Sequence, residues 1–223
     1  MRLSCFDYGV DLTFEENMVN VLVVENQQVY SAVLGTILQQ ISGEAAIWQF
    51  SDAEKDLQMS KTVSLVHSPF LIDLNSKKSL NYLYKEMQMI TDEFFSDKVG
   101  ELNSAIVDCL DGIAEKLSYP VEFNLDLSMV DVFKLYDVHF DFRDSSLIEK
   151  VLNFVQLEKV LFGTRLIIFV NLKSYFDTSQ LQELYKVACY NKMPLLLIES
   201  AKRDCLNAEK YCIIDKDKCL IEF

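Results

Sequence analysis

The feature of this chain that most constrains its fold is a rhythm of strand and helix patterns, interrupted once by a long helical stretch. Val19 to Val24 is a continuous apolar, β-branched run typical of a buried strand, and Asn26 to Ile41 follows with apolar residues at helical spacing. The same order returns at residues 164–171, at the helix opened by Asp177, and at Pro194 to Ile198. This order favours parallel strands joined by right-handed crossovers.

The interruption has a different character. Ser76 to about Leu117 carries apolar residues at helical spacing throughout, with Gly100 as the predicted kink or junction. Tyr119-Pro120 ends this stretch, and a second helical piece is predicted over Ser128 to Tyr136. We therefore predict an α/β protein with a mostly parallel sheet in a head formed by residues 1–73 and 141–223, and an α-helical leg inserted at residues 74–140.

Several shorter patterns complete the head. Alternating residues at 2–6 and 10–14 predict a β-hairpin around Gly9, and residues 45–50 and 62–67 predict further strands. Asp144 is the predicted cap of a helix that runs to Phe162 and ends at Gly163. Residues 212–215 and 219–223 predict a terminal strand pair.

Composition limits the class of protein. The chain has 223 residues, of which 50% are apolar, enough to bury a substantial core. No apolar run approaches the roughly 20 residues of a membrane-spanning helix, and the first residues lack the pattern of a signal peptide. We expect a cytoplasmic protein. The six cysteines form no CxxC pair and are expected to be free thiols.

The charge distribution leaves two interpretations open. The net charge of −13 argues against nucleic-acid binding, which usually needs a basic surface. The charges are segregated, however, because residues 3–54 contain eight acids and no Lys or Arg. The chain therefore carries either a solvated acidic face alone or, elsewhere, a local basic surface as well.

The sequence offers no recognisable catalytic site. The turn after Val24 reads Glu25-Asn26-Gln27-Gln28, without the glycines and lysine of a phosphate-binding loop. His67 and His139 are each isolated and are interpreted as structural. No GxSxG or HExxH motif is present. We therefore expect a protein that is not an enzyme.

Two groups of charged residues remain open to interpretation. Acids are densest at residues 122–149, where they form either a solvated face or a site for a hard cation. Lys77, Lys78 and Lys85 open the helical leg, and positions 78 and 85 share one helix face. These lysines serve either solubility or contact with a partner.

Two segments carry a resemblance to a known family. The first is Phe70 to Met87, with the motif Asp73-Leu-Asn-Ser76 followed by Leu and Tyr at helical spacing. The second is Leu166-Ile-Ile-Phe-Val-Asn171 with the helix from Asp177 and Leu195-Leu-Leu-Ile-Glu199. In these segments and in the order of its parts, the chain resembles the ring-forming CRISPR-associated adaptation proteins of type II-A systems.

The resemblance implies a head related to P-loop folds that lacks their phosphate loop, and a homotetrameric ring that binds linear double-stranded DNA ends during spacer acquisition. It implies the CRISPR integrase complex and the effector nuclease as partners. Lys77, Lys78 and Lys85 are then candidate DNA contacts. Four weakly basic inner faces would combine into one positive channel.

The resemblance also implies calcium as a cofactor. Asp126, Asp131 and Asp141 match family positions and are the candidate ligands. The chain departs from the family by lacking an acidic stretch between Leu127 and Ser128, so weaker calcium binding is expected. The alternative function is a degenerate metal-dependent nuclease or phosphohydrolase that uses the acids of residues 122–144. A third alternative is an oligomeric interaction module that does not bind nucleic acid.

Overall fold

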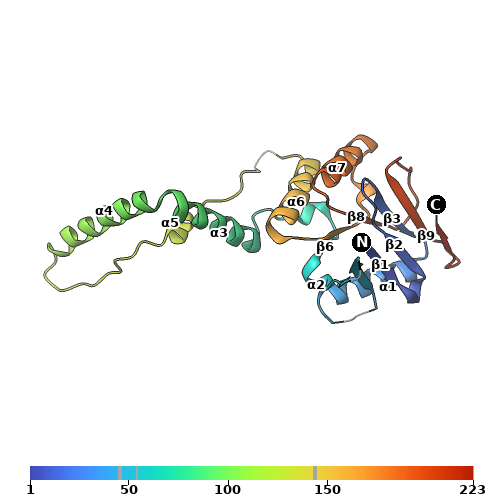
Figure 1. Ribbon diagram of the computed structural model, residues 1–223, viewed down its shortest axis with the longest axis horizontal. Helices are drawn as coiled ribbons and strands as arrows, with labels where there is room; N and C mark the ends of the chain where they lie inside the picture. Colours follow the sequence, from blue (N-terminus) through green and yellow to red (C-terminus); the bar gives the residue numbers. More distant parts are fainter. Residues whose placement is uncertain (45–46, 54, 143–144, 223) are drawn as a thin grey trace. The chain divides into compact units, whose positions relative to one another are not determined.

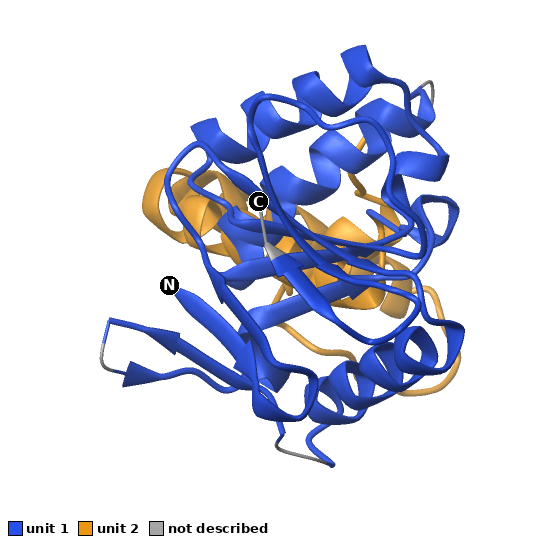
Figure 2. Ribbon diagram, turned by 90° about the vertical axis from the view of Figure 1, so that its right-hand side faces the viewer, with its two compact units in different colours: residues 1–74, 142–223 blue, residues 75–141 orange. Residues whose placement is uncertain are grey.

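A computed structural model describes residues 1–44, 47–53, 55–142 and 145–222. The chain forms two compact units (Figure 2): unit 1 comprises Met1–Leu74 with Phe142–Phe223, and unit 2 comprises Asn75–Asp141. The boundaries lie one residue beyond those expected for the head and the leg. The division therefore follows the change of pattern seen in the sequence.

Unit 1 is built on a six-stranded sheet, which confirms the α/β class. Its order is β10 (Leu220–Glu222), β9 (Glu209–Ile214), β3 (Val19–Val24), β8 (Leu195–Glu199), β7 (Leu166–Val170) and β6 (Val63–Val66). The strands from β9 to β6 pair in parallel, and only β10 is antiparallel to its neighbour. Apolar runs such as Leu166–Val170 form these strands because both faces of the sheet are covered.

Helices α6 (Leu147–Phe162) and α7 (Thr178–Tyr190) cover one face of this sheet (Figure 1). Helix α1 (Gln27–Ile41) and the strands of a second sheet cover the other face. Alternate residues of each strand divide between the two cores. In β3, for example, Val21 and Val23 face α6 and α7, whereas Leu22 and Val24 face α1.

The second sheet is antiparallel, in the order β2 (Val10–Thr13), β1 (Arg2–Cys5), β4 (Gln49–Asp52) and β5 (Lys55–Asp56). The predicted hairpin is confirmed as β1 and β2, at one edge of this sheet, with a 3₁₀ turn η1 (Phe6–Tyr8) and Gly9 at φ 67°. The strand predicted at 45–50 begins at Gln49, and residues 45–46 lie outside the described part. Strand β5 and helix α2 (Met59–Thr62) were not predicted.

The caps of α6 and α7 differ in how well the sequence indicated them. Asp177 caps α7, and its side chain and that of Gln180 each accept a main-chain N–H of the other, as predicted. In α6 the cap is Ser146, which forms the same kind of box with Glu149. The predicted cap, Asp144, lies outside the described residues, and the helix begins later than expected.

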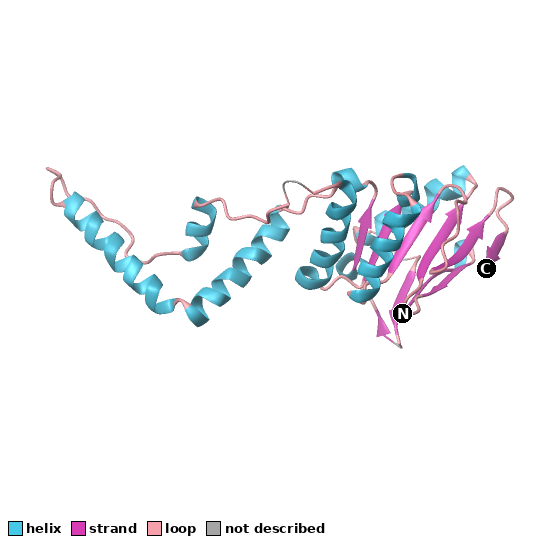
Figure 3. Cartoon of the chain, turned by 90° about the horizontal axis from the view of Figure 1, so that it is seen from above, coloured by secondary structure: helices cyan, strands magenta, loops and turns pink. Residues whose placement is uncertain are grey.

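Unit 2 contains helices and loops (Figure 3). They are α3 (Lys77–Phe94), α4 (Ser96–Ala114) and α5 (Met129–Leu135). The long predicted helix is divided at Phe95, whose φ of −128° and ψ of 9° leave the helical region. The prediction of a junction at Gly100 is wrong, because Gly100 lies inside α4. Ser96 and Asp97 start the second helix, and an acid in a first turn complements the helix dipole.

A small core and two hydrogen bonds hold unit 2 together. The rings of Tyr84 on α3 and Phe133 on α5 lie 6.2 Å apart, and both side chains are buried. The Asn75 side chain donates to the Phe140 carbonyl at 3.1 Å and accepts the Phe140 N–H at 2.9 Å. By contrast, α4 contains no buried residue. The two ends of the insertion are therefore joined. One face of α4 is only partly covered, where the Asn103 side chain donates to the Leu125 carbonyl at 2.8 Å.

None of the six cysteines, all within the described residues, forms a disulfide, as expected. None of the described helices is long and apolar enough to cross a bilayer.

Candidate nucleic-acid interface

The candidate DNA-contacting lysines lie at the start of α3. Ser76 caps this helix, because its Oγ accepts the N–H of Ser79 at 3.2 Å. Lys77 and Lys78 follow as the first two helical residues, Lys85 lies two turns later, and all three are exposed. The N-terminal end of a helix dipole is positive, so lysines at this position interact unfavourably with the dipole. Their charges and the dipole together make the local electrostatic potential positive.

One face of α3 combines lysines with larger exposed side chains. At 100° per residue, Lys78, Tyr82, Lys85 and Met89 lie within about 60° of one another around the helix axis. All four are exposed. Lys77 lies about 100° away from Lys78 and extends the basic area around the first turn. We refer to Lys77, Lys78 and Lys85 as the α3 lysines.

The rest of unit 2 is acidic. Residues 75–141 contain six lysines, no arginine and thirteen acids. Three of those lysines are the α3 lysines, and a fourth, Lys134, pairs with Asp131 at 2.9 Å. Positive charge in unit 2 is thus concentrated at the start of α3, and a polyanion would meet fewer acids there than along α4.

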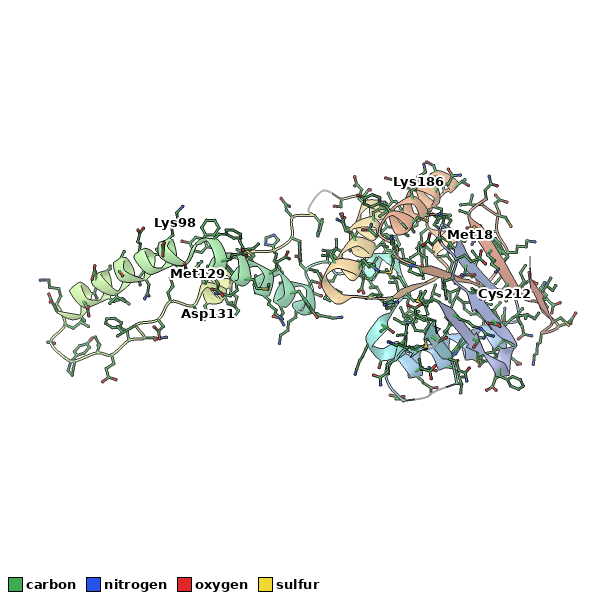
Figure 4. All side chains as sticks on the ribbon, in the orientation of Figure 1. Met18, Lys98, Met129, Asp131, Lys186 and Cys212 are labelled. Carbon is green, nitrogen blue, oxygen red and sulfur yellow. The ribbon has the colours of Figure 1, made fainter. Side chains whose placement is uncertain are left out.

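The structure does not gather the candidate calcium ligands. Asp131 lies in the first turn of α5 (Figure 4), and its hydrogen bond with Lys134 holds the pKa of its carboxyl below the usual range. Asp126 and Asp141 are exposed on segments outside the helices. Within the described residues no three His, Cys, Asp or Glu side chains meet as a metal site. Among the described residues of one chain, Asp126, Asp131 and Asp141 do not form a calcium site.

The turn from β3 into α1 has its own geometry. Asn26 Oδ1 accepts the N–H groups of Gln28 and Val29 at 3.1 and 3.2 Å. The Asn26 amide also donates to the Lys216 carbonyl at 2.9 Å, which ties the turn to the β9–β10 hairpin. The N–H groups that a phosphate would use at this helix start are therefore occupied by the chain itself.

A buried polar network that joins the turn after β7 to the first residues of β9 was not predicted. Lys173 Nζ donates to Glu209 at 2.8 Å and to Tyr211 at 2.6 Å, and the Tyr185 hydroxyl donates to Glu209 at 2.5 Å. Burial is the main cause that raises the pKa of both tyrosines. The available sequence signal was polar residues at the ends of apolar strands, such as Asn171 and Glu199.

Glu199 and Asn171 connect this network to α1. Glu199 Oε1 accepts the Lys173 N–H at 3.0 Å, and Asn171 Oδ1 accepts the Ser200 N–H at 2.9 Å. The Asn171 amide donates to the Tyr30 hydroxyl at 2.8 Å, and burial is the largest cause raising the pKa of Tyr30. These bonds hold the loops that follow β7 and β8 against the start of α1.

A pocket of 560 Å³ lies at the opposite, amino-terminal edge of the sheet. Its wall includes Glu15, Asp52, Lys159, Arg165 and Lys192. Glu15 pairs with Lys210, and Asp52 pairs with Arg165. None of the candidate site residues lines this pocket.

Comparison with known proteins gives three similarities. The family model described as CRISPR-associated protein (Cas_Csn2) matches residues 40–218. The CRISPR-associated protein Csn2 of Enterococcus faecalis is 23% identical over 174 residues, which cover 75% of this chain and 77% of that protein. A solved ATP-binding cassette of an ABC transporter, in its ADP conformation, aligns over 95% of this chain and 85% of its own with a TM-score of 0.47 and 14% identity.

The family model spans well over half of the chain and includes both segments that carried the resemblance in the sequence. The resemblance is therefore confirmed at the level of the family. This chain belongs to the Cas_Csn2 family of CRISPR-associated proteins.

Proposed function

We propose that this protein is a non-catalytic, cytoplasmic scaffold that binds the ends of linear double-stranded DNA during spacer acquisition. It acts as a homotetrameric ring, with the CRISPR integrase complex and the effector nuclease as partners. The observation that carries the DNA contact is the group of α3 lysines, which concentrates positive charge at one helix start in an otherwise acidic unit. Such contacts with phosphates are independent of base sequence.

The proposal includes a head that is related to P-loop folds but has lost the phosphate loop. The turn before α1 contains Glu25 and Asn26 where such a loop has glycines and a lysine. Asn26 occupies two of the N–H groups that would otherwise bind phosphate. Both observations support a scaffold that does not hydrolyse nucleotides.

The assembly is supported by α4. Its apolar residues Leu102, Ile106 and Ile113 lie within about 40° of one another on the helix and are exposed. An apolar stripe that the described part of its own chain leaves exposed fits an oligomer in which another copy covers it. This supports the homotetramer of the proposal.

The test of the DNA contacts is a charge-reversal variant, Lys77→Glu with Lys78→Glu and Lys85→Glu. Each lost phosphate contact should reduce the slope of log affinity against log salt by about 0.9. We expect affinity for linear duplex DNA to fall at least ~10-fold at 0.15 M salt. Fluorescence anisotropy over a salt series, with linear and covalently closed circular duplexes of equal length, measures both quantities.

The matched control is Lys55→Glu with Lys61→Glu and Lys186→Glu, which changes the net charge equally at exposed lysines of unit 1 (Figure 4 shows Lys186 on α7). It should bind DNA nearly as well as the natural protein. Equal loss in both variants would show a general charge effect and remove the α3 lysines as contacts. Equal binding of linear and closed circular DNA by the natural protein would contradict recognition of ends.

A further inference from the structure

The carboxyl edge of the six-stranded sheet exposes a cluster of apolar side chains. Phe70 and Leu71 belong to the 3₁₀ turn η2 (Pro69–Leu71) after β6, and Tyr175 follows the turn η3 (Leu172–Ser174) after β7. Phe70 is 63% exposed, Leu71 79% and Tyr175 39%. The Phe70 and Tyr175 rings meet edge to face, with centroids 5.7 Å apart. We call these three residues the edge aromatic cluster.

Cationic groups lie on both sides of this cluster. Lys150 Nζ donates to the Phe70 carbonyl at 3.5 Å, so its ammonium lies beside that turn. Arg203 donates to the Ser174 hydroxyl at 2.9 Å, next to Tyr175, and about half of its side chain is exposed. The carboxylate of the nearby Asp177 caps α7, where it accepts the Gln180 N–H. Asp73 is exposed two residues after Leu71, and Glu199 lies 4.0 Å from Arg203. An anionic partner of the rings would therefore have to contact Lys150 and the exposed part of Arg203.

Buried residues next to the cluster in the sequence hold it in place. Pro69 and Ile72 are buried on either side of Phe70 and Leu71, and Leu172 and Phe176 are buried on either side of Tyr175. The bond from the Lys173 N–H to Glu199 fixes η3 to the end of β8. Exposed rings on such a support lose little conformational freedom when they bind a partner.

The position of the cluster is one at which parallel sheets bind ligands. After β3 the chain crosses to β6, at one edge of the sheet. After β8 it crosses in the opposite direction, past β3, to β9. Ligands of open α/β sheets bind outside the carboxyl ends of the strands, and the cluster lies at this end of β6 and β7, beside the edge of the sheet and not at the switch point next to β3. The loops after β6, β7 and β8, which carry the cluster and Arg203, all lie at the carboxyl edge.

We propose that the edge aromatic cluster binds unpaired nucleotides at the end of a DNA molecule. Bases stack on Phe70 and Tyr175, and Lys150 and Arg203 contact the adjoining phosphates. Interior base pairs are stacked on both faces and a blunt terminal pair exposes only one face, whereas unpaired nucleotides can place several bases on the rings, so the cluster prefers frayed or single-stranded termini. This inference rests on the proposed binding of DNA ends and adds a preference for the form of the end.

The experiment compares the natural protein with a double variant that carries both Phe70→Ala and Tyr175→Ala. The labelled probes are a blunt duplex, the same duplex with a tail of about eight thymidines, and the free thymidine oligonucleotide. The natural protein should bind the tailed duplex at least ~5-fold more tightly than the blunt one. The double variant should lose this preference and keep its affinity for the blunt duplex.

Two further variants separate stacking from other effects. Tyr190→Ala removes a ring that is 89% exposed at the end of α7 and should leave the tail preference unchanged. Phe70→Trp keeps a stacking surface and should keep the preference. Thermal unfolding of each variant verifies that the fold is intact.

The outcomes distinguish this inference from the proposed function. If the natural protein binds blunt and tailed duplexes equally, or if the double variant keeps the preference, the cluster does not bind nucleotides. If the natural protein binds no duplex, the proposed function fails. The inference is then decided by whether the natural protein binds the free thymidine oligonucleotide. Loss of oligonucleotide binding in the double variant would still support it. No binding to any probe would overturn it and assign the surface to a protein partner.

Discussion

Glu199 is an unusual residue because it ends an apolar strand with a buried carboxylate. It is 1% exposed, and its Oε1 accepts the Lys173 N–H. Its Oε2 has no hydrogen-bond partner within the described residues, and Arg203 Nε lies 4.0 Å away. Burial is the main cause that raises the pKa of the Glu199 carboxyl. The folded protein therefore binds a proton here more tightly than the unfolded chain does.

This residue predicts how stability depends on pH. Because the folded pKa is raised, the favourable contribution of protonated Glu199 is complete below the unfolded pKa near 4.3 and is lost as pH rises through the folded pKa. Glu199→Gln keeps the acceptor for Lys173 and removes the charge. We expect it to raise the free energy of unfolding at pH 8 by about 1–3 kcal/mol, because a neutral amide costs less to bury than an ionised carboxylate.

Denaturant titrations at pH 5 and pH 8 measure this effect, which should be smaller at pH 5. Glu209→Gln is the matched control. Glu209 accepts from Lys173, Tyr185 and the Leu206 N–H, so its neutralisation should destabilise the protein. The same sign of change in both variants would contradict the role assigned to Glu199.

At the scale of the element, the division between α3 and α4 corrects the expectation from sequence. A glycine is the usual signal for a junction, yet the break is at Phe95 and Gly100 is helical. A Cβ at Gly100 would meet no atom within 4 Å, and Gly100 is not among the residues with positive φ. Nothing in the geometry of the chain requires glycine at this position.

Gly100→Ala should therefore stabilise α4. We expect a gain of about 0.5–1 kcal/mol, because alanine restricts the unfolded chain and fits a helix. Thermal unfolding followed by circular dichroism measures it, with Gly112→Ala in the same helix as the comparison, since it also has open space around it. Destabilisation at Gly100 alone would show that a hinge or a partner needs this glycine.

At the scale of the whole molecule, the exposed stripe of α4 predicts how the protein assembles. Leu102→Lys with Ile106→Lys places two charges in a face that another copy is proposed to cover. We expect the tetramer to dissociate, because the free energy needed to bury an unpaired charge exceeds the free energy that the apolar contacts of such a stripe contribute. Light scattering after size exclusion measures the mass of the particle.

Ser104→Lys is the control for this assembly test. Ser104 is exposed and lies about 160–200° around α4 from Leu102 and Ile106, so a lysine there faces away from the stripe. This variant should keep the mass of the natural protein. A double variant that remains tetrameric would place the interface elsewhere, and a natural protein that is monomeric would contradict the proposed ring.

The sequence by itself determined the class of the fold, the main strands and helices, and the family. These depend on local patterns: apolar runs such as Leu166–Val170 indicate burial on both faces, and Asp177 with Gln180 indicates a helix start. Asp73 to Ser76 and the residues that follow carried the resemblance, which the family match confirmed. Such signals arise within a few neighbouring residues, so they can be identified before the fold is known.

Only the tertiary structure decided which residues meet. The hairpin at the start of the chain pairs with β4 to build a second sheet, although the two segments are some forty residues apart. Lys173 meets Glu209 in a buried pair, and Phe70 meets Tyr175 at the sheet edge. The candidate aspartates, in contrast, do not assemble into a metal site within the described residues. Strand order and long-range packing place these groups, and no local pattern encodes them.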